Sequence, residues 1–337
     1  MKIILDAMGG DNAPGAILQG AVQAAKELGV EVTAVGDVQK MQAAAKELGL
    51  ELSGVQLVHA SEQITMEDEP ARAIRRKKDS SMVVGLRMLA QGEGDAFVSA
   101  GSTGALHVGA SLLVRSLKGV KRPALATIIP GVEPFLLLDC GANVECRPGM
   151  LEAFGVMGSV YMQQVMGVES PRVALLNNGA EETKGPPLYQ QAHQLLKENP
   201  HIRFVGNIEP RDIPAGTADV VVADGFTGNA VLKLTEGLAK FFGGKIKSIF
   251  KKNIISKLSY LMVKGGVAEF KASMDADSYG GAPLLGAAKP VIKAHGSSNA
   301  LAIKNAIRQA KLCVENDLCG VMGRNLAAVQ IQEEGDA

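Results

Sequence analysis

Short apolar runs, most of them ending in glycine or asparagine, recur along the chain and constrain its fold more than any other feature. The runs that read as buried strands are KIILDA, EVTAVG, VQLVHA, DAFVSAG, LATIIPG, FLLLDCG, RVALLNNG, IRFVGN and ADVVVADG. Amphipathic helical patterns lie between many of them, for example at 14–28, 82–89 and 150–166. This alternation of strand, glycine turn and helix predicts an α/β fold with a mainly parallel sheet and helices on both faces.

The chain has 337 residues, without a repeat of fixed period or a low-complexity linker. Because α/β folds of this size often form one unit with a full core, we expect a single α/β domain over residues 1–337. One break in composition interrupts it. The segment 237–266, GLAKFFGGKIKSIFKKNIISKLSYLMVKGG, carries lysines but no Asp or Glu, and we interpret it as an amphipathic helical insertion.

Composition excludes several classes of protein. The 35 basic and 35 acidic side chains balance, and the chain has no Trp and 4% aromatic residues, which argues against nucleic-acid binding. The apolar run at the start is too short for a signal peptide. The longest stretch without Asp, Glu, Lys or Arg, 96–114, is interrupted by SAGSTG and a histidine, so it is a poor membrane span. We therefore expect a cytoplasmic protein.

The four cysteines form two widely separated pairs, Cys140 with Cys146 and Cys313 with Cys319. A structural zinc site favours a tighter spacing of its cysteines. We expect reduced thiols and no metal site.

Three strand-to-helix loops carry glycines and small polar side chains. In parallel sheets the ligand crevice lies beyond the carboxyl ends of the strands. There, glycine lets the backbone approach a ligand, and hydroxyls and the free N–H groups of a helix start favour an anion. The polar and glycine residues of these loops are Ser99, Gly101, Ser102, Thr103 and Gly104; Asp224, Thr227, Gly228 and Asn229; and His295, Ser297, Ser298 and Asn299.

Two further loops add to this set. LNNGAEETKGPP presents Lys184, a point charge suited to phosphate. LLLDCGANVECRPG presents Asn143 and Asp139, and Asp139 can equally brace its loop by hydrogen bonds to the backbone. Each loop alone is also compatible with an ordinary helix cap. The combination of all of them at the same end of one sheet favours an anion-binding site.

Missing motifs narrow the choice of enzyme class. The chain has no G-x-S-x-G elbow, and its Gly244-Lys245 pair lacks the upstream glycine of a P-loop. The loops also do not spell the six-residue dinucleotide fingerprint. A serine hydrolase and an ordinary NTPase are disfavoured, and a nicotinamide enzyme is a weak alternative.

Read together, ILDAMGGDNAP, KKDSSM, SAGSTGA, LDCGAN, ETKG, DGFTGN, YGGAPLLG and HGSSNA closely resemble the bacterial phosphate acyltransferases of the PlsX family. The resemblance implies transfer of a long acyl chain from acyl carrier protein to inorganic phosphate, which gives an acyl phosphate for phospholipid synthesis. It also implies a homodimer. The implied fold is Rossmann-like and three-layered, related to isocitrate and isopropylmalate dehydrogenases and to phosphotransacetylase, without their nicotinamide cofactor.

The residues fit this chemistry. Phosphate is anionic near neutral pH and a thiol of pKa about 8.5 leaves readily, so the reaction needs a cradle and oxyanion donors rather than a strong base. Our hypothesis assigns catalysis to Lys184, Asn229, His295 and Asn299. It assigns phosphate and acyl binding to Ser99, Gly101, Ser102, Thr103, Gly104, Asn143, Asp224, Thr227, Gly228 and Ser297.

Two basic segments remain. In RAIRRKKDSSM, the side chains of Arg75, Arg76, Lys77 and Lys78 either form a solvated helix face or steer an acidic carrier protein toward the site. In 237–266, apolar residues recur at helical spacing on either side of KKN, which predicts two amphipathic helices.

The apolar faces of these two helices, with lysines beside them, suit the anionic inner face of a cell membrane. The residues expected to contact it are Phe241, Phe242, Ile249, Leu258 and Leu261. A hairpin at a dimer interface is the alternative, and both uses are compatible.

Three functions therefore remain. The acyl carrier protein:phosphate acyltransferase is favoured. A short-chain phosphotransacylase that uses coenzyme A would not need the apolar lysine segment. A membrane-associated binding or scaffold protein would keep the fold without turnover.

Overall fold

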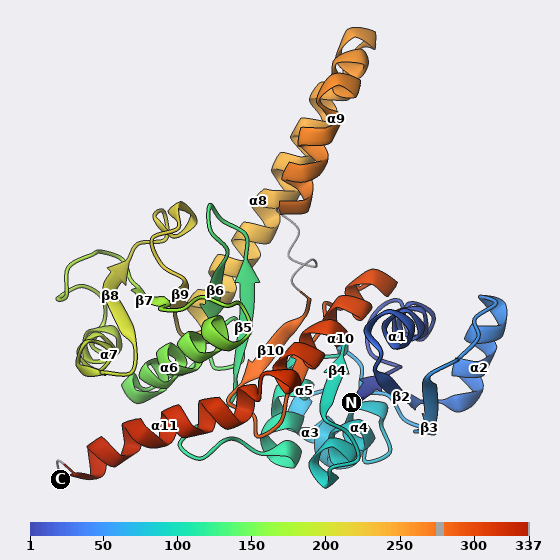
Figure 1. The fold of residues 1–337 in the computed structure, drawn as a ribbon, viewed down its shortest axis with the longest axis horizontal. Coiled ribbons are helices and arrows are strands. Elements are labelled where there is room, and N and C mark those ends of the chain that lie inside the picture. The colour runs from blue at the N-terminus through green and yellow to red at the C-terminus, as the bar shows by residue number, and fades with distance from the viewer. Residues whose placement is uncertain (274–279, 336–337) are drawn as a thin grey trace.

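The computed structural model describes residues 1–273 and 280–335, and its core is one sheet of eleven strands between two layers of helices (Figure 1). The strands, in chain order, are β1 (Lys2–Asp6), β2 (Glu31–Gly36), β3 (Val55–His59), β4 (Ala96–Ser99), β5 (Ala124–Ile129), β6 (Phe135–Leu138), β7 (Arg172–Leu176), β8 (Arg203–Ile208), β9 (Val220–Val222), β10 (Ala282–Leu285) and β11 (Val291–Lys293). The predicted α/β class is confirmed, and every predicted run contains a strand. Only β10 and β11 were not predicted.

The sheet consists of two parallel halves that run in opposite directions. Its order is β3-β2-β1-β4-β11-β10-β5-β6-β9-β7-β8. Neighbours from β3 to β11 are parallel, and so are those from β6 to β8. Between them β10 is antiparallel to β11 and β5, and β5 is antiparallel to β6. The expectation that all the loops lie at the same end of one sheet is therefore wrong, because strand direction reverses at β6.

Helices cover both faces of the sheet. They are α1 (Gly15–Leu28), α2 (Val38–Glu47), α3 (Pro70–Arg76), α4 (Ser81–Gln91), α5 (Thr103–Gly109) with a π-helical turn at Ala110–Val114, α6 (Pro148–Gln164), α7 (Pro187–Glu198), a 3₁₀ turn at Ile213–Ala215, α8 (Gly225–Lys251), α9 (Ile254–Ser273), α10 (Ala300–Glu315) and α11 (Leu318–Gly335). Alternate residues of a strand point to opposite faces. Accordingly Ile3 and Leu5 join the core under α1, α6, α7 and α10, whereas Ile4 joins the core under α3, α4 and α5.

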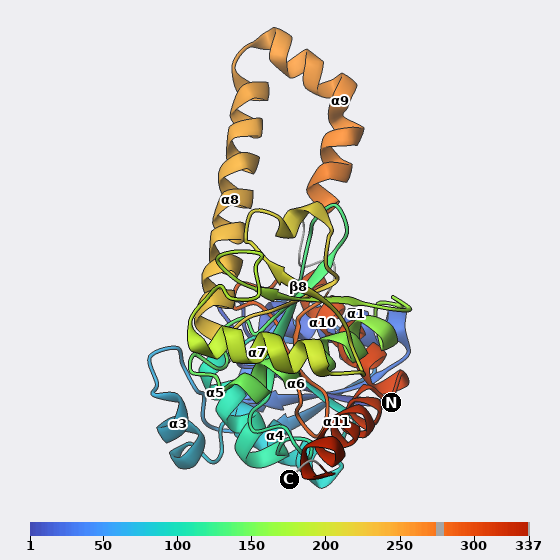
Figure 2. The same ribbon diagram turned by 90° about the vertical axis from the view of Figure 1, so that its left-hand side faces the viewer.

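Helices α8 and α9 form a hairpin that projects from the body of the molecule (Figures 1 and 2). The break lies at 252–253, where the Asn253 side chain accepts a hydrogen bond from the N–H of Ser256 at 2.8 Å. Helix α8 begins at Gly225, in one of the predicted site loops, so the segment 237–266 continues a helix of the body. Within the described ranges, no helix is both long and apolar enough to cross a membrane.

Candidate active site

A cleft of about 430 Å³ opens where the two halves of the sheet meet. It receives residues from both halves even though their strands run in opposite directions. The polar side chains that line it are Thr103, Thr127, Asn229, Lys233, Thr235, Glu236, Lys293, His295 and Ser298. Three predicted site residues, Thr103, Asn229 and His295, therefore lie in one cleft.

Buried Asp6 organises the loop between β4 and α5. Its carboxylate accepts hydrogen bonds from the hydroxyls of Ser81 and Ser99, each at 2.6 Å. Ser99 Oγ accepts in turn from the N–H of Gly101 at 3.0 Å. Burial raises the pKa of Asp6 despite these hydrogen bonds. Ser99 and Gly101 thus shape the loop, and Thr103 is the member of this loop that lines the cleft.

Ser102 caps α5 by accepting a hydrogen bond from the N–H of Ala105 at 3.4 Å. Gly104, in the first turn of the same helix, is exposed, and a Cβ built there would stand 2.9 Å from Pro70. These two residues join α5 to its surroundings and are not among those that line the cleft.

Asp139 holds the loop after β6. One carboxylate oxygen accepts from the N–H groups of Leu125, Gly141 and Ala142, and the other accepts from the backbone and side chain of Asn143. The side-chain carbonyl of Asn143 is buried and has no hydrogen-bond partner within residues 1–273 and 280–335, whereas its amide donates to the carbonyl of Pro123 at 2.9 Å. Asp139 is therefore a brace, with no part of its carboxylate left for substrate.

The start of α8 packs directly on this brace. A Cβ on Gly228 would stand 1.9 Å from the carbonyl oxygen of Asp139, so only glycine fits there. Asp224 caps the helix by accepting from the N–H and hydroxyl of Thr227, at 2.9 and 2.8 Å, and it also accepts from the Tyr189 hydroxyl. These contacts orient the first turn of α8, so the side chains of Asp224 and Thr227 have a structural role.

Asn229 is exposed in the cleft and lies against Gly141. A Cβ on Gly141, whose φ is +121°, would stand 3.4 Å from the Cγ of Asn229. Among the described residues, the Asn229 amide has no hydrogen-bond partner that would compete with a ligand. Of the predicted site residues at the start of α8, Asn229 is the one that lines the cleft.

His295 brings a proton donor to the cleft. Its Nδ1 accepts from the backbone N–H of Ser297 at 3.2 Å and lies 2.8 Å from the Ser297 hydroxyl. In the neutral ring the proton then lies on Nε2, which is left as a hydrogen-bond donor. Ser297 therefore orients His295. Asn299 caps α10, accepting from the N–H of Ala302 at 3.0 Å, and lies outside this cleft.

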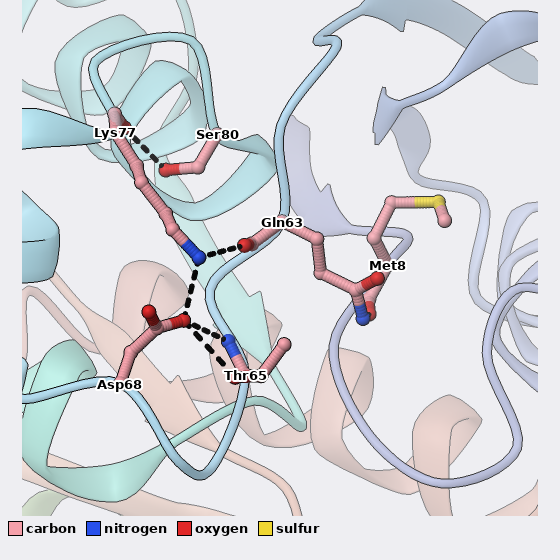
Figure 3. Close-up of polar contacts among 6 residues, drawn as sticks. All are labelled: Met8, Gln63, Thr65, Asp68, Lys77 and Ser80. Atoms are coloured by element: carbon pink, nitrogen blue, oxygen red, sulfur yellow. Dashed lines mark hydrogen bonds and ion pairs between the residues drawn. The ribbon is translucent and has the colours of Figure 1, made fainter.

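Two predicted lysines are placed differently. Lys184 is exposed on the loop after β7, and it is not among the residues that line the cleft. Tyr189, at the start of α7, links that loop to the cap of α8. Lys77, shown in Figure 3, donates to the carbonyl of Gln63 at 2.9 Å and to the carboxylate of Asp68 at 2.7 Å, which lowers the pKa of Asp68 to about 2. Lys77 thus braces a loop, whereas Arg75, Arg76 and Lys78 remain exposed.

Lys293 and Lys233 line the cleft although the sequence analysis did not single them out. Lys233 is exposed and pairs with Glu236 at 2.9 Å. Lys293 ends a buried strand and is 8% exposed. The sequence signal was a lysine directly after the apolar pair Val291-Ile292. Cys140 also lines the cleft, but burial raises the pKa of its thiol to about 12, so it is a poor nucleophile.

Comparison with known proteins decides the family. A model of the family described as "Fatty acid synthesis protein" matches residues 1–321. The phosphate acyltransferase of Alkaliphilus oremlandii is 47% identical over 317 residues, which cover 94% of this chain and 94% of that protein. The chain belongs to the phosphate acyltransferase family. The phosphate acyltransferase of Thermoanaerobacterium thermosaccharolyticum is 46% identical over 330 residues, 98% of both chains. The predicted family is confirmed, and the protein is an acyltransferase.

Solved structures of two phosphotransacetylases have a similar fold. The enzyme EutD from Staphylococcus aureus superposes with a TM-score of 0.61 at 20% identity, covering 93% of this chain and 94% of that one. The phosphotransacetylase from Streptococcus pyogenes gives a TM-score of 0.63 at 17% identity and covers 94% of each chain. At these identities the likeness concerns the fold alone, and it confirms the expected relation to phosphotransacetylase at that level.

The contact between α8 and the Asp139 loop leads to a testable prediction about stability. We expect Gly228→Ala to lower the free energy of unfolding by about 1–3 kcal/mol, because the added methyl group overlaps the Asp139 carbonyl. Gly237→Ala in the same helix meets nothing within 4 Å and is the control, expected to raise stability by about 0.5–1 kcal/mol. Urea unfolding measures both, and equal effects would contradict the packing argument.

Proposed function

We propose that this acyltransferase moves a long acyl chain from acyl carrier protein to inorganic phosphate and so forms an acyl phosphate for phospholipid synthesis. The observation that carries the proposal is the course of α8. It begins at the cleft, where Asn229 and Lys233 lie, and continues without a break into the exposed apolar hairpin. A short-chain enzyme has no use for this connection, whereas a long acyl group needs an apolar path beside its reacting carbonyl.

The chemistry requires no cofactor. An oxygen of the phosphate dianion attacks the thioester carbonyl, the C–O bond forms, and the C–S bond breaks to release the thiolate of the carrier's prosthetic group. The thiolate then takes a proton, and the products are acyl phosphate and free thiol. Asn229 and the Nε2–H of His295 are the donors that we assign to the oxyanion and to the leaving sulfur.

The apolar part of the cleft suits the acyl chain. Its walls come from β5 and from α8, and the apolar side chains that line it are Leu125, Ile128, Ile129, Leu232 and Ala239. The polar lining residues come from the loops after β4 and β11 and also from α8, which carries Asn229, Lys233 and Glu236. A thioester carbonyl beside Asn229 would have both hydrogen-bond donors and hydrocarbon within reach.

Thioester loss from palmitoyl acyl carrier protein, with and without phosphate, tests the reaction when acyl phosphate is detected by mass. We expect phosphate-dependent product, and we expect Asn229→Ala to lower kcat about 100-fold because it removes one oxyanion donor. Lys184→Ala changes a residue outside the cleft and is assayed under the same conditions as Asn229→Ala. Turnover of acetyl coenzyme A instead would identify a short-chain enzyme, and no turnover with any thioester would favour a scaffold.

We further propose that the exposed side chains of Arg75, Arg76 and Lys78 dock the acidic carrier protein. They lie at the end of α3, which packs against α5, the helix that brings Thr103 to the cleft. Lys77 is already paired with Asp68 and contributes less charge to this surface.

Charge reversal tests the docking surface. The double variant Arg75→Glu/Arg76→Glu should raise the KM for acyl carrier protein about tenfold at low salt, with kcat unchanged and a smaller effect at high salt. The control Lys26→Glu/Lys46→Glu reverses the same number of exposed charges on α1 and α2. An equal rise in both double variants would attribute the effect to net charge and remove the docking surface.

We also propose that the hairpin contacts the anionic inner face of the cell membrane, and that the protein is a cytoplasmic homodimer. The apolar side chains of the hairpin stay exposed, with Phe241 at 55%, Leu258 at 59% and Met262 at 89%. Its lysines interleave with them, and each lysine near an anionic surface contributes about 1 kcal/mol. The same exposed face is available to a second copy of the chain.

Flotation with vesicles that contain anionic lipid tests this contact. We expect Phe241→Ser/Ile249→Ser/Leu258→Ser/Leu261→Ser to abolish flotation while the fold is kept. The control Val132→Ser/Val144→Ser/Val205→Ser removes exposed apolar groups away from the hairpin. Unchanged flotation of the hairpin variant would refute membrane contact. If the variant is a monomer by size-exclusion chromatography where the wild type is a dimer, the apolar face belongs to the contact with a second copy.

A further inference from the structure

Lys293 is a buried cation in the wall of the cleft. It is the last residue of β11, between Val98 and Ser99 of β4 on one side and Ala282 of β10 on the other. The residue as a whole is 8% exposed, yet it lines the cleft. Placing an ammonium in such a position is costly unless an anion or several hydrogen-bond acceptors compensate it.

The hydrogen bonds of the Lys293 ammonium compensate its buried charge only in part. The Nζ atom donates to the carbonyl oxygen of Ala100 at 3.3 Å and to that of Ala294. Among the described residues no carboxylate forms an ion pair with it. Two carbonyl dipoles satisfy two of its three donors and supply no countercharge.

The charged groups near Lys293 come from β1, the loop after it, the loop after β11 and α8, where Glu236 lines the cleft and is paired with Lys233. Asp6 of β1 and Asp11 of the following loop stabilise the ammonium, and Lys233 of α8 destabilises it. His295 lies two residues further along the chain and lines the same cleft. Desolvation is the largest effect and lowers the pKa of Lys293 to about 8, so the group is mostly protonated at neutral pH.

Ser298 supplies a second, independent observation. It lies on the loop that follows β11, is 4% exposed, and lines the same cleft. Its buried hydroxyl has no hydrogen-bond partner among the described residues. Among the described residues, a cation without an ion-pair partner and a hydroxyl without a hydrogen-bond partner lie on one short segment and form a site that an oxyanion completes.

We propose that Lys293, in its ammonium form, binds the phosphate substrate directly in the cleft together with the hydroxyl of Ser298. This rests on the proposed function only in taking phosphate as the acyl acceptor. Lys293 then acts as a substrate-binding residue that holds the nucleophile beside the thioester. Loss of a lysine with a purely structural role would change stability or turnover, with no effect specific to the KM for phosphate.

The sign of the pH dependence follows from the lowered pKa. Below about pH 8 the ammonium is present and binds phosphate; above it the amine is neutral and must take up a proton when phosphate binds. Phosphate itself is a dianion throughout the range above pH 8. The KM for phosphate should therefore rise toward tenfold per pH unit above pH 8 in the wild-type enzyme.

Steady-state kinetics of Lys293 variants test the inference. Lys293→Met should raise the KM for phosphate about 10- to 100-fold, leave the KM for acyl carrier protein within about twofold, and abolish the rise above pH 8. Lys293→Arg keeps its charge and should bind phosphate with a flat profile over that range. The control is Lys289→Met, on the loop before β11 and outside the cleft. A Lys293→Met enzyme with the wild-type KM for phosphate and the wild-type pH profile would overturn the proposal.

Competitive labelling of the wild-type protein covers the case in which the variants fail to fold. A trace of acetic anhydride acylates only neutral amines, so labelling of Lys293 against pH reports its pKa. Phosphate should suppress this labelling and move its midpoint upward from about 8, while Lys289 is unaffected. Labelling of Lys293 that ignores saturating phosphate would overturn the proposal even if phosphate-dependent acyl transfer is observed. Protection by phosphate in a protein that transfers no acyl group would support this site and refute the proposed reaction.

Discussion

The reversal of strand direction in the middle of the sheet is the constraint on which the site depends. Because β10 is antiparallel to both β11 and β5, and β5 is antiparallel to β6, two parallel halves of opposite direction join in one hydrogen-bonded sheet. A uniformly parallel sheet would align all strand ends along one edge. Here the loops of both halves contribute to one cleft at the junction, where a nucleophile and an electrophile can be held by separate walls.

Helix α8 connects that junction to the surface of the molecule. Its first turn is fixed by the Asp224 cap and by the close contact of Gly228 with the Asp139 carbonyl. Its later turns lie in the projecting hairpin (Figure 2). Since a helix is stiff over this length, the position of Asn229 in the cleft and the direction of the hairpin are set by the same packing contact. The cleft residue Asn229 and the exposed apolar side chains of α8 thus belong to one helix.

The buried charged groups of the site are satisfied in different ways. Asp139 accepts hydrogen bonds from five donors, and Asp6 accepts from two hydroxyls and a backbone N–H. Both carboxylates therefore hold loops in place. Lys293 has two carbonyl partners and, in the part of the chain that the structure describes, no ion pair. The two carboxylates are thus more fully compensated by short-range contacts than the ammonium in the wall of the cleft.

The sequence by itself determined the nine predicted strand runs and the family, and it placed Asn229 and His295 in strand-to-helix loops, because these depend on local patterns and motifs. It could not determine the partners of the strands. Strands β10 and β11 were not predicted. Because β10 is antiparallel to both of its neighbours, the two halves run in opposite directions only because β5 is also antiparallel to β6. Only the tertiary structure decided that Asp139 braces a loop, that Asn299 lies outside the cleft, and that Lys293 is buried in its wall. Burial and the partners of a charge depend on residues distant in sequence, so no local pattern specifies them.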